Sequence, residues 1–169
     1  MKSDEIHHPT GNSEQSDDIT MFSVEFPGET IILENRIDQL PLLSVFVRDM
    51  CGKYGVAKEI VGDVDIAVDE LGSNIVLYAY PREETHTFHT FFHCVNGELT
   101  ITFVDEGVPF DPTRPTETHL DLPPEERPLG GLGIMMVKEL MDKVEYQRKG
   151  GKNILRIAKR FAGATPDRV

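Results

Sequence analysis

The chain has 169 residues, of which 39% are hydrophobic and 27% are charged, so it suits one soluble globular domain with a core of its own. Its formal net charge of −12 argues against nucleic acid or an anionic membrane surface as a main partner, because both require clustered lysine and arginine. No apolar run reaches the roughly 20 residues of a membrane span, and the N-terminus lacks the pattern of a signal peptide.

Both ends of the chain are expected to lie outside the folded domain. Residues 1–20 are polar and predict a disordered tail, because they cannot bury enough apolar surface to offset the entropy of ordering. His7 and His8 within this tail are interpreted as a solvated pair. The folded domain is therefore expected to span residues 21–162, with a short C-terminal tail over residues 163–169.

The first half of the domain predicts short strands followed by two helices. Apolar residues alternate over residues 22–26 and continue at 31–33, which predicts one or two strands. The first helix has Asp38 as a candidate cap and Gly55 as its end. Its apolar side chains repeat at helical spacing, at Leu43, Val47, Met50 and Tyr54. The second helix is expected over residues 58–80, directly before a proline.

The second half predicts two hairpins separated by a long loop and a helix. Asn96-Gly97 lies between two strand patterns and is a strong signal for a tight hairpin turn. Residues 106–130 contain six prolines and form a loop long enough to be functional or mobile. The predicted elements are strands near 85–95 and 98–105, a helix near 133–142, and strands near 144–148 and 153–160. Hairpins pair strands antiparallel, so we expect an α+β two-layer sandwich with a mixed, mostly antiparallel sheet and helices on one face.

The second predicted helix carries a carboxylate and an amide within its apolar face. On a wheel of about 100° per residue, Glu70 and Asn74 lie together on the inward side. Asp65, Asp69 and Ser73 lie on the opposite side, which is expected to face solvent. Two interpretations stay open: an internal hydrogen bond between Glu70 and Asn74, or a pocket wall that presents a base and a metal-binding oxygen.

The strand near 98–105 ends in a carboxylate that is expected to point inward. Strand alternation places Asp105 on the core side, with Ile101 and Phe103. A buried carboxylate there can accept a hydrogen bond from an exocyclic amine such as that of adenine, and Gly107 lets the backbone approach a ligand. The alternative is an aspartate that caps a turn at the end of its strand.

A glycine-rich stretch, residues 129–133, opens the last predicted helix. Backbone N–H groups at a helix start attract anions, and the helix dipole adds to that attraction. A flexible hinge followed by a helix cap is the alternative. The stretch matches neither a phosphate-binding P-loop nor a dinucleotide-binding motif.

These three segments, taken in order, resemble the ATPase superfamily of gyrase, heat-shock chaperones, histidine kinases and mismatch-repair proteins. The matching pattern is Glu70-x-x-x-Asn74, then Asp105-x-Gly107-x-Pro109-Phe110-Asp111-Pro112, then Gly130-Gly131-Leu132-Gly133-Ile134. Within that superfamily the chain is most similar to bacterial anti-sigma factor serine/threonine-protein kinases. The features that favour this branch are the small size, Asp111-Pro112, the run over residues 127–133 and the run over residues 151–155.

The resemblance implies an ATP- and Mg²⁺-binding site. It implies that Asn74 coordinates Mg²⁺, that Glu70 orients or deprotonates the attacking hydroxyl, and that Asp105 binds the adenine amine. Residues 111–130 would form a lid over ATP, with Arg127 near the terminal phosphate. The implied nucleotide-binding residues are Asn74, Tyr78, Asp105, Gly107, Phe110, Arg127, Gly130, Gly131, Leu132, Gly133, Ile134 and Asn153.

The chain departs from this family at two of the implied positions. Asn153 stands where relatives often have threonine, and Tyr78 stands where they often have histidine. The resemblance further implies a serine or threonine of an anti-sigma factor antagonist as phosphate acceptor. It implies a sigma factor as the other partner, a choice set by ATP or ADP, and a possible homodimer.

Three other functions stay open at this point. The same residues fit a nucleotide-gated binding module that transfers no phosphate. A histidine-kinase catalytic domain and an interaction domain without a ligand are the remaining alternatives.

Two cysteines and a pair of histidines have spacings that do not favour a metal site. Cys51 and Cys94 are far apart and form no CxxC pair, so we interpret them as free thiols of a reduced, cytoplasmic protein. His89 and His93 lie four positions apart on a predicted strand, or about 13 Å, which is too far to share one ion. We interpret these histidines as solvent-facing.

Overall fold

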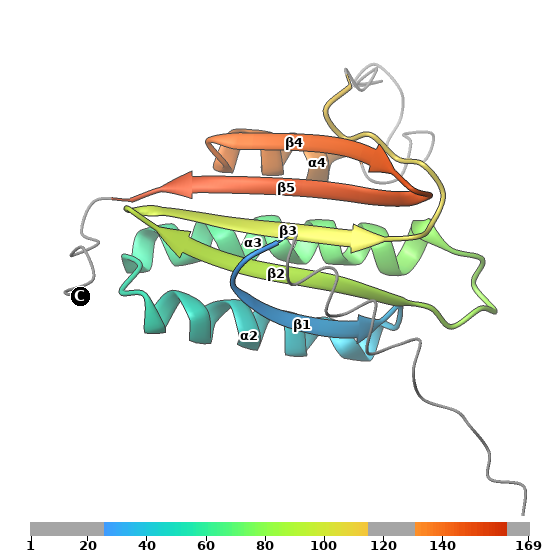
Figure 1. Ribbon diagram of the computed structural model, residues 1–169, viewed down its shortest axis with the longest axis horizontal. Helices are drawn as coiled ribbons and strands as arrows, with labels where there is room; N and C mark the ends of the chain where they lie inside the picture. The colour runs from blue at the N-terminus through green and yellow to red at the C-terminus, as the bar shows by residue number, and fades with distance from the viewer. Residues whose placement is uncertain (1–25, 115–130, 162–169) are drawn as a thin grey trace, which may run out of the picture.

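The computed structural model describes residues 26–114 and 131–161 (Figure 1). The predicted terminal tails, residues 1–20 and 163–169, lie outside the described residues. The same holds for residues 115–130, which form most of the predicted lid.

Five strands form one sheet in the described part of the chain. The strands are β1 (Glu29–Glu34), β2 (Thr87–Val95), β3 (Glu98–Asp105), β4 (Lys143–Lys149) and β5 (Lys152–Arg160). Their order in the sheet is β1-β2-β3-β5-β4, and each neighbouring pair is antiparallel. The sheet therefore grows from hairpins, with β5 inserted between β3 and β4.

Within the described ranges, three helices cover one face of this sheet. They are α2 (Leu40–Lys53), α3 (Lys58–Asn74) and α4 (Gly131–Leu140), and Figure 1 shows all three behind the strands. A short 3-10 segment, η1 (Ile37–Gln39), precedes α2, and a π-helical turn, η2 (Ile75–Ala79), extends α3. The predicted α+β two-layer sandwich is confirmed.

Both predicted hairpin turns are present, and both use residues with positive φ. Asn96 and Gly97 join β2 to β3 with φ angles of 51° and 76°. Gly150 and Gly151 join β4 to β5 with φ angles of 57° and 81°. Two consecutive positive φ angles match the right-handed twist of the flanking strands, which fixes the register of each hairpin.

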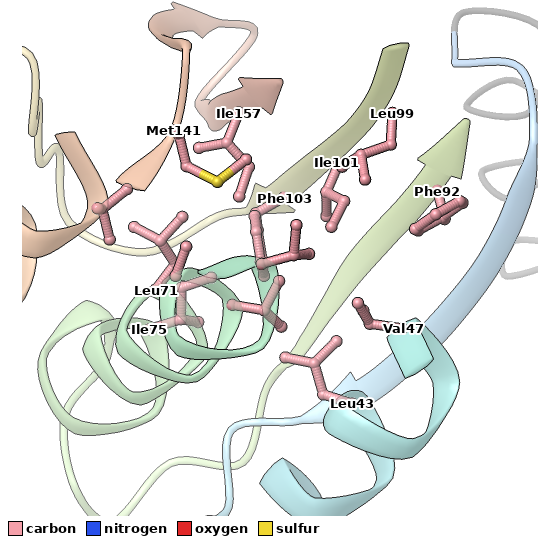
Figure 2. Packing of buried hydrophobic residues seen from close by; sticks show 14 of the residues in the cluster. Leu43, Val47, Leu71, Ile75, Phe92, Leu99, Ile101, Phe103, Met141 and Ile157 are labelled. Atoms are coloured by element: carbon pink, nitrogen blue, oxygen red, sulfur yellow. The ribbon is translucent and has the colours of Figure 1, made fainter. Parts of the chain in front are cut away.

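The hydrophobic core lies between the helices and the inner face of the sheet (Figure 2). Figure 2 shows Leu71 and Ile75, from α3 and η2, close to Phe103 of β3. Fully buried side chains come from every layer of the fold, including Leu43, Val47, Val64, Phe88, Phe92, Ile101 and Ile157. Because α3 packs over β3, the inward positions at the C-terminal end of α3 meet the end of β3.

Two predictions about the helices were wrong. Asp38 does not cap α2: it lies within η1 and pairs with Arg36 at 2.7 Å, and Gln39 precedes the helix without a side-chain cap. Asp65 does not face solvent, because α2 packs beside α3 and brings Arg48 into an ion pair with Asp65. The predicted end of the first helix is correct, since Gly55 follows it with a φ of 65°.

The sheet face away from the helices carries a second, smaller apolar cluster. It consists of Phe26, Phe91, Val104 and Ile154. His89 and His93 lie on this face, away from the helices, as expected for solvent-facing residues. Both side chains are nevertheless half-buried, so solvent does not surround them. The described residues hold no group of three or more side chains suited to a metal ion.

None of the helices within the described ranges combines the length and hydropathy that a bilayer span requires. Cys51 and Cys94 are both free thiols, and burial raises the pKa of Cys51 to about 11. A thiol with so high a pKa is unreactive at neutral pH.

Candidate functional site

A cavity of about 210 Å³ lies where the end of α3 meets the end of β3. Its walls come from α3 and η2 on one side, from β4 and β5 on the other, and from the segment that follows β3. The lining residues are Leu71, Asn74, Ile75, Tyr78, Ala79, Asp105, Val108, Pro109, Phe110, Tyr146, Asn153 and Leu155. Most of these side chains are apolar or aromatic, which suits a flat organic ring.

Asp105 is the buried acid of this cavity. Strand alternation places it on the inner face as predicted, and its side chain is only 7% exposed. Its Oδ1 accepts hydrogen bonds from the Gly107 backbone N–H and from Asn153 Nδ2, each at 2.8 Å. Burial raises the pKa of Asp105. Both hydrogen bonds that the described residues donate to this carboxylate fall on Oδ1, which leaves Oδ2 for a ligand.

Gly107 brings the segment after β3 against η2. A Cβ at this position would lie 2.4 Å from the Ala79 carbonyl oxygen and 2.6 Å from the Ala79 Cβ. The neighbouring Val108 N–H donates to the same carbonyl at 2.8 Å. Only glycine fits this close approach of two backbone segments, and the approach closes one end of the cavity.

Gly107→Ala is expected to lower the free energy of unfolding by about 1–3 kcal/mol, because the added methyl group meets rigid backbone. Urea titration measures this change. Gly52→Ala in α2 is the matched control, since a Cβ there meets nothing within 4 Å and is expected to stabilise the helix slightly. Equal stabilities of the two variants would show that the backbone at Gly107 can shift to accommodate the methyl group without loss of stability.

Asn74 lines the cavity, whereas Glu70, one helical turn earlier on α3, does not line it and lies against the start of α4. The Asn74 Nδ2 is buried with no hydrogen-bond partner among the described residues. Nδ2 therefore does not form the internal hydrogen bond with Glu70 that the sequence left open. A buried amide nitrogen without a partner costs free energy. A polar ligand that accepts a hydrogen bond from Asn74 would remove that cost.

Glu70 is half-buried and faces the first turn of α4. A Cβ on Gly133 would lie 2.0 Å from Glu70 Oε2, so the carboxylate rests directly against that glycine. The helix α4 begins at Gly131, two residues before the predicted start, which places Gly131 and Gly133 in its first turn. Free backbone N–H groups of a first turn point out of the helix and favour a negative charge in front of it.

Comparison with known proteins decides the family of the chain. The profile of the histidine kinase-like ATPase domain matches residues 33–159. The chain belongs to this family. The match includes α3, η2, β2, β3, α4, β4 and all of β5 but its last residue, so it covers every residue that lines the cavity.

Several curated proteins are similar to this ATPase domain. The serine-protein kinase RsbW of Bacillus cereus (strain B4264) is 25% identical over 124 residues, covering 71% of this chain and 77% of that protein. Proteins of the same name from Bacillus anthracis (strain A0248) and Bacillus thuringiensis (strain Al Hakam) match with the same identity and coverage.

A solved structure supports the fold of the ATPase domain. The RsbU and RsbW domains of Rv1364c from Mycobacterium tuberculosis superpose with a TM-score of 0.53 at 13% identity. The match covers 79% of this chain and 33% of that one, so this chain spans about a third of the solved protein. At this identity the likeness establishes the fold alone.

The other predicted site residues differ in where they lie. Tyr78 and Phe110 line the cavity and are 43% and 52% exposed, as suits its mouth. Leu132 is 70% exposed, whereas Ile134 is 2% exposed and belongs to the core. Arg127 and Gly130 lie outside the described residues. The binding role of each predicted residue stays a prediction.

Several cavity residues were missed by the sequence analysis. Tyr146 and Leu155 line the cavity from β4 and β5, where they lie opposite each other in register. Arg148 lies opposite Asn153 in the same hairpin. The alternation that located Asp105 could have located these residues, because the Gly150-Gly151 turn sets their pairing.

Proposed function

We propose that this ATPase domain is an ATP- and Mg²⁺-dependent serine/threonine protein kinase that also acts as an anti-sigma factor. The observation that carries the proposal is the presence of two polar side chains in one apolar cavity: the Asp105 carboxylate, and Asn74, whose Nδ2 has no partner among the described residues. The similarity to serine-protein kinases supports it. The phosphate acceptor is a serine or threonine of an anti-sigma factor antagonist, and a sigma factor is the alternative partner.

The adenine base occupies the apolar part of the cavity in this proposal. Asp105 Oδ2 accepts a hydrogen bond from the exocyclic amine of the base. Leu71, Ile75 and Leu155 supply apolar surface for its ring. A guanine base would present a carbonyl oxygen to the carboxylate, so the site favours ATP over GTP.

The triphosphate extends from the base toward Asn74 and the first turn of α4. Asn74 supplies an amide oxygen suited to Mg²⁺, and no group of three or more acidic, histidine or cysteine ligands exists among the described residues. Mg²⁺ commonly takes few protein ligands, and when bound it neutralises phosphate charge and aligns the terminal phosphate. The N–H groups of Gly131 and Gly133 then face the phosphates.

Glu70 is the proposed general base of the site. Its carboxylate lies against Gly133 in the first turn of α4, where the terminal phosphate would end in this proposal. From there it orients the acceptor hydroxyl and takes its proton as the hydroxyl oxygen bonds to the terminal phosphorus of ATP, whose bond to the bridging oxygen breaks to release ADP.

The regulatory part of the proposal is partner choice by nucleotide state. The protein works in the cytoplasm as a homodimer, and the bound nucleotide, ATP or ADP, sets whether it engages the sigma factor or the antagonist that it phosphorylates. The net charge of −12 leaves direct DNA binding outside this scheme.

The decisive experiment incubates the purified chain with Mg²⁺, γ-labelled ATP and antagonist proteins from the same genome. Label on a serine or threonine of one antagonist is the expected result. Calorimetric binding of ATP without transfer to any antagonist would instead favour a nucleotide-gated binding module. Absence of both heat and thermal stabilisation by ATP and Mg²⁺ would remove the nucleotide site itself.

Gly133→Ala is expected to slow phosphate transfer about 10- to 100-fold while ATP affinity and melting temperature change little. The new methyl group would meet Glu70 Oε2, which is the end of a flexible side chain, so the carboxylate turns away and the backbone stays. Single-turnover transfer measures the rate. Gly62→Ala on α3 is the control, because a Cβ there meets nothing within 4 Å. A normal rate for Gly133→Ala would show that the position of Glu70 is unimportant.

A further inference from the structure

A row of polar side chains crosses three strands beside the cavity. Asp105 of β3 lies opposite Asn153 of β5, and Asn153 lies opposite Arg148 of β4. All three point to the inner face, because residues that are paired in register share a face. The row therefore runs from the cavity to the edge strand of the sheet.

The Asn153 side chain is fully engaged within this row. Its Nδ2 donates to Asp105 Oδ1 at 2.8 Å and to the Val108 carbonyl at 3.0 Å. Its Oδ1 accepts from Arg148 Nη1 at 2.7 Å and from the Tyr146 hydroxyl at 2.8 Å. An amide offers two donor hydrogens and two acceptor sites, so all four are occupied by the protein.

The direction of the Asn153 amide follows from its neighbours. Arg148 can only donate, so the atom that faces it must be the amide oxygen. The amide nitrogen then faces Asp105, which accepts. Arg148 Nη1 also donates to the Gly107 carbonyl at 3.1 Å, so one guanidinium holds both Asn153 and the segment after β3.

We propose that Asn153 and Arg148 are positioning residues that orient the Asp105 carboxylate toward the base and make no hydrogen bond to the nucleotide themselves. The proposal rests on the proposed function only in taking ATP as the ligand of Asp105. It revises the expectation that Asn153 binds the nucleotide directly, because Asn153 keeps no free donor or acceptor for it.

The electrostatics of the row give it a second effect on Asp105. Burial disfavours the charged carboxylate and raises its pKa, while the hydrogen bond from Asn153, the Gly107 N–H and the charge of Arg148 act in the opposite direction. The other ionisable groups that act on Asp105 are Glu106 beside it and the Tyr80 phenol. The row thus favours the charged form of a carboxylate whose burial disfavours that form.

Asn153→Asp isolates the donor that faces Asp105. The new carboxylate still accepts from Tyr146 and Arg148, but it places an oxygen against Asp105 Oδ1 where the amide nitrogen stood. At pH 8 two carboxylates face each other and repel. At pH 5.5 they are expected to share a proton, which restores one hydrogen bond between them.

The affinity for ATP is measured by calorimetry in the presence of Mg²⁺. Each variant is compared with wild type at the same pH, so that the protonation of ATP itself affects both equally. Asn153→Asp binds about 10- to 100-fold more weakly at pH 8, and at pH 5.5 the deficit shrinks to within about 5-fold. Asn153→Thr, whose hydroxyl can still donate to Asp105, restores affinity to within about 3-fold at both pH values.

Arg148→Met tests the outer end of the row. It removes the donor to Asn153 Oδ1 and to the Gly107 carbonyl, and ATP affinity is expected to fall about 3- to 10-fold. Gln147→Met is the matched control on the same strand. Gln147 lies opposite Ile154, on the other face of the sheet, so its replacement is expected to leave ATP affinity unchanged.

Each failure has a distinct meaning. Wild type that binds no ATP would overturn the proposed function and this inference together. Wild type that binds ATP, with Asn153→Asp equal to it at both pH values, would overturn the inference alone. A loss that is the same at both pH values and in Asn153→Thr would also overturn it, since that pattern indicates a structural or direct contact. If Asn153→Asp does not fold, equal affinities of Arg148→Met and Gln147→Met overturn the inference.

Discussion

Asp105→Asn is expected to weaken ATP binding about 10- to 100-fold and to abolish the preference for ATP over GTP. The new amide oxygen keeps the place of Oδ1, because Gly107 N–H and Asn153 Nδ2 both donate to it at 2.8 Å. The amide nitrogen therefore takes the place of Oδ2 and meets the adenine amine, donor against donor. Guanine presents an acceptor at the same point and gains a partner.

The loss of ATP binding in this variant is not expected to come from unfolding. Burial raises the pKa of Asp105, which means that the folded state disfavours its charge, so a neutral amide is expected to leave the melting temperature unchanged or slightly higher. Asp69→Asn is the control for charge removal, because Asp69 is exposed on α3. Calorimetry with both nucleotides measures the preference. A variant that still prefers ATP would place the adenine site elsewhere.

The local rules of helices and strands were enough to place two residues that line the cavity, Asp105 and Asn74. Strand alternation placed Asp105 on the inner face, and the helical wheel placed Glu70 and Asn74 together on the inward side of their helix. Both rules depend only on residue spacing within one element, so they hold whatever the element packs against. The Asn96-Gly97 turn was equally local, since φ angles of 51° and 76° are properties of that dipeptide.

Contacts between elements were not predictable in the same way. Asp65 was expected in solvent because a wheel shows one helix, whereas its ion pair with Arg48 depends on how α2 lies against α3. Asp38 is of a residue type that often caps helices, but it lies within a 3-10 turn that precedes the helix, and there it pairs with Arg36. The surroundings of such residues depend on how one element packs against another. The spacing of residues along the chain carries no information about that packing.

The hydrogen bonds around Asn153 also depend on contacts between elements that the sequence did not predict. Asn153 was predicted from a family motif, which marks a position without saying what its side chain contacts. Its partners Tyr146 and Arg148 come from β4, an element that the motif does not include. Only the pairing of β4 with β5 brings them together. The motif therefore marked the position of Asn153, and the sheet register determines which side chains contact it.

Glu70→Gln is expected to slow phosphate transfer to the antagonist about 10²- to 10⁴-fold, because glutamine keeps the shape of the side chain and cannot accept the proton of the acceptor hydroxyl. ATP affinity is expected to stay within a few-fold of wild type, since Asp105 and Asn74 provide the predicted contacts to the nucleotide. Single-turnover transfer and calorimetry separate the two effects. Asp69→Asn, one position away on the exposed side of α3, is the control.

A double-mutant cycle with Gly133→Ala tests whether Glu70 acts through the position of its carboxylate. The methyl group of Gly133→Ala acts by displacing Glu70 Oε2, from which an added Cβ would lie only 2.0 Å. If that carboxylate is the base, Gly133→Ala costs nothing further once Glu70 is glutamine, so the two effects on the transfer rate are not additive. Full additivity would mean that Gly133 acts on the phosphates through its backbone alone. Normal transfer by Glu70→Gln would remove Glu70 from the chemistry and leave Asn74 and the first turn of α4 as the parts of the site that act on the phosphates.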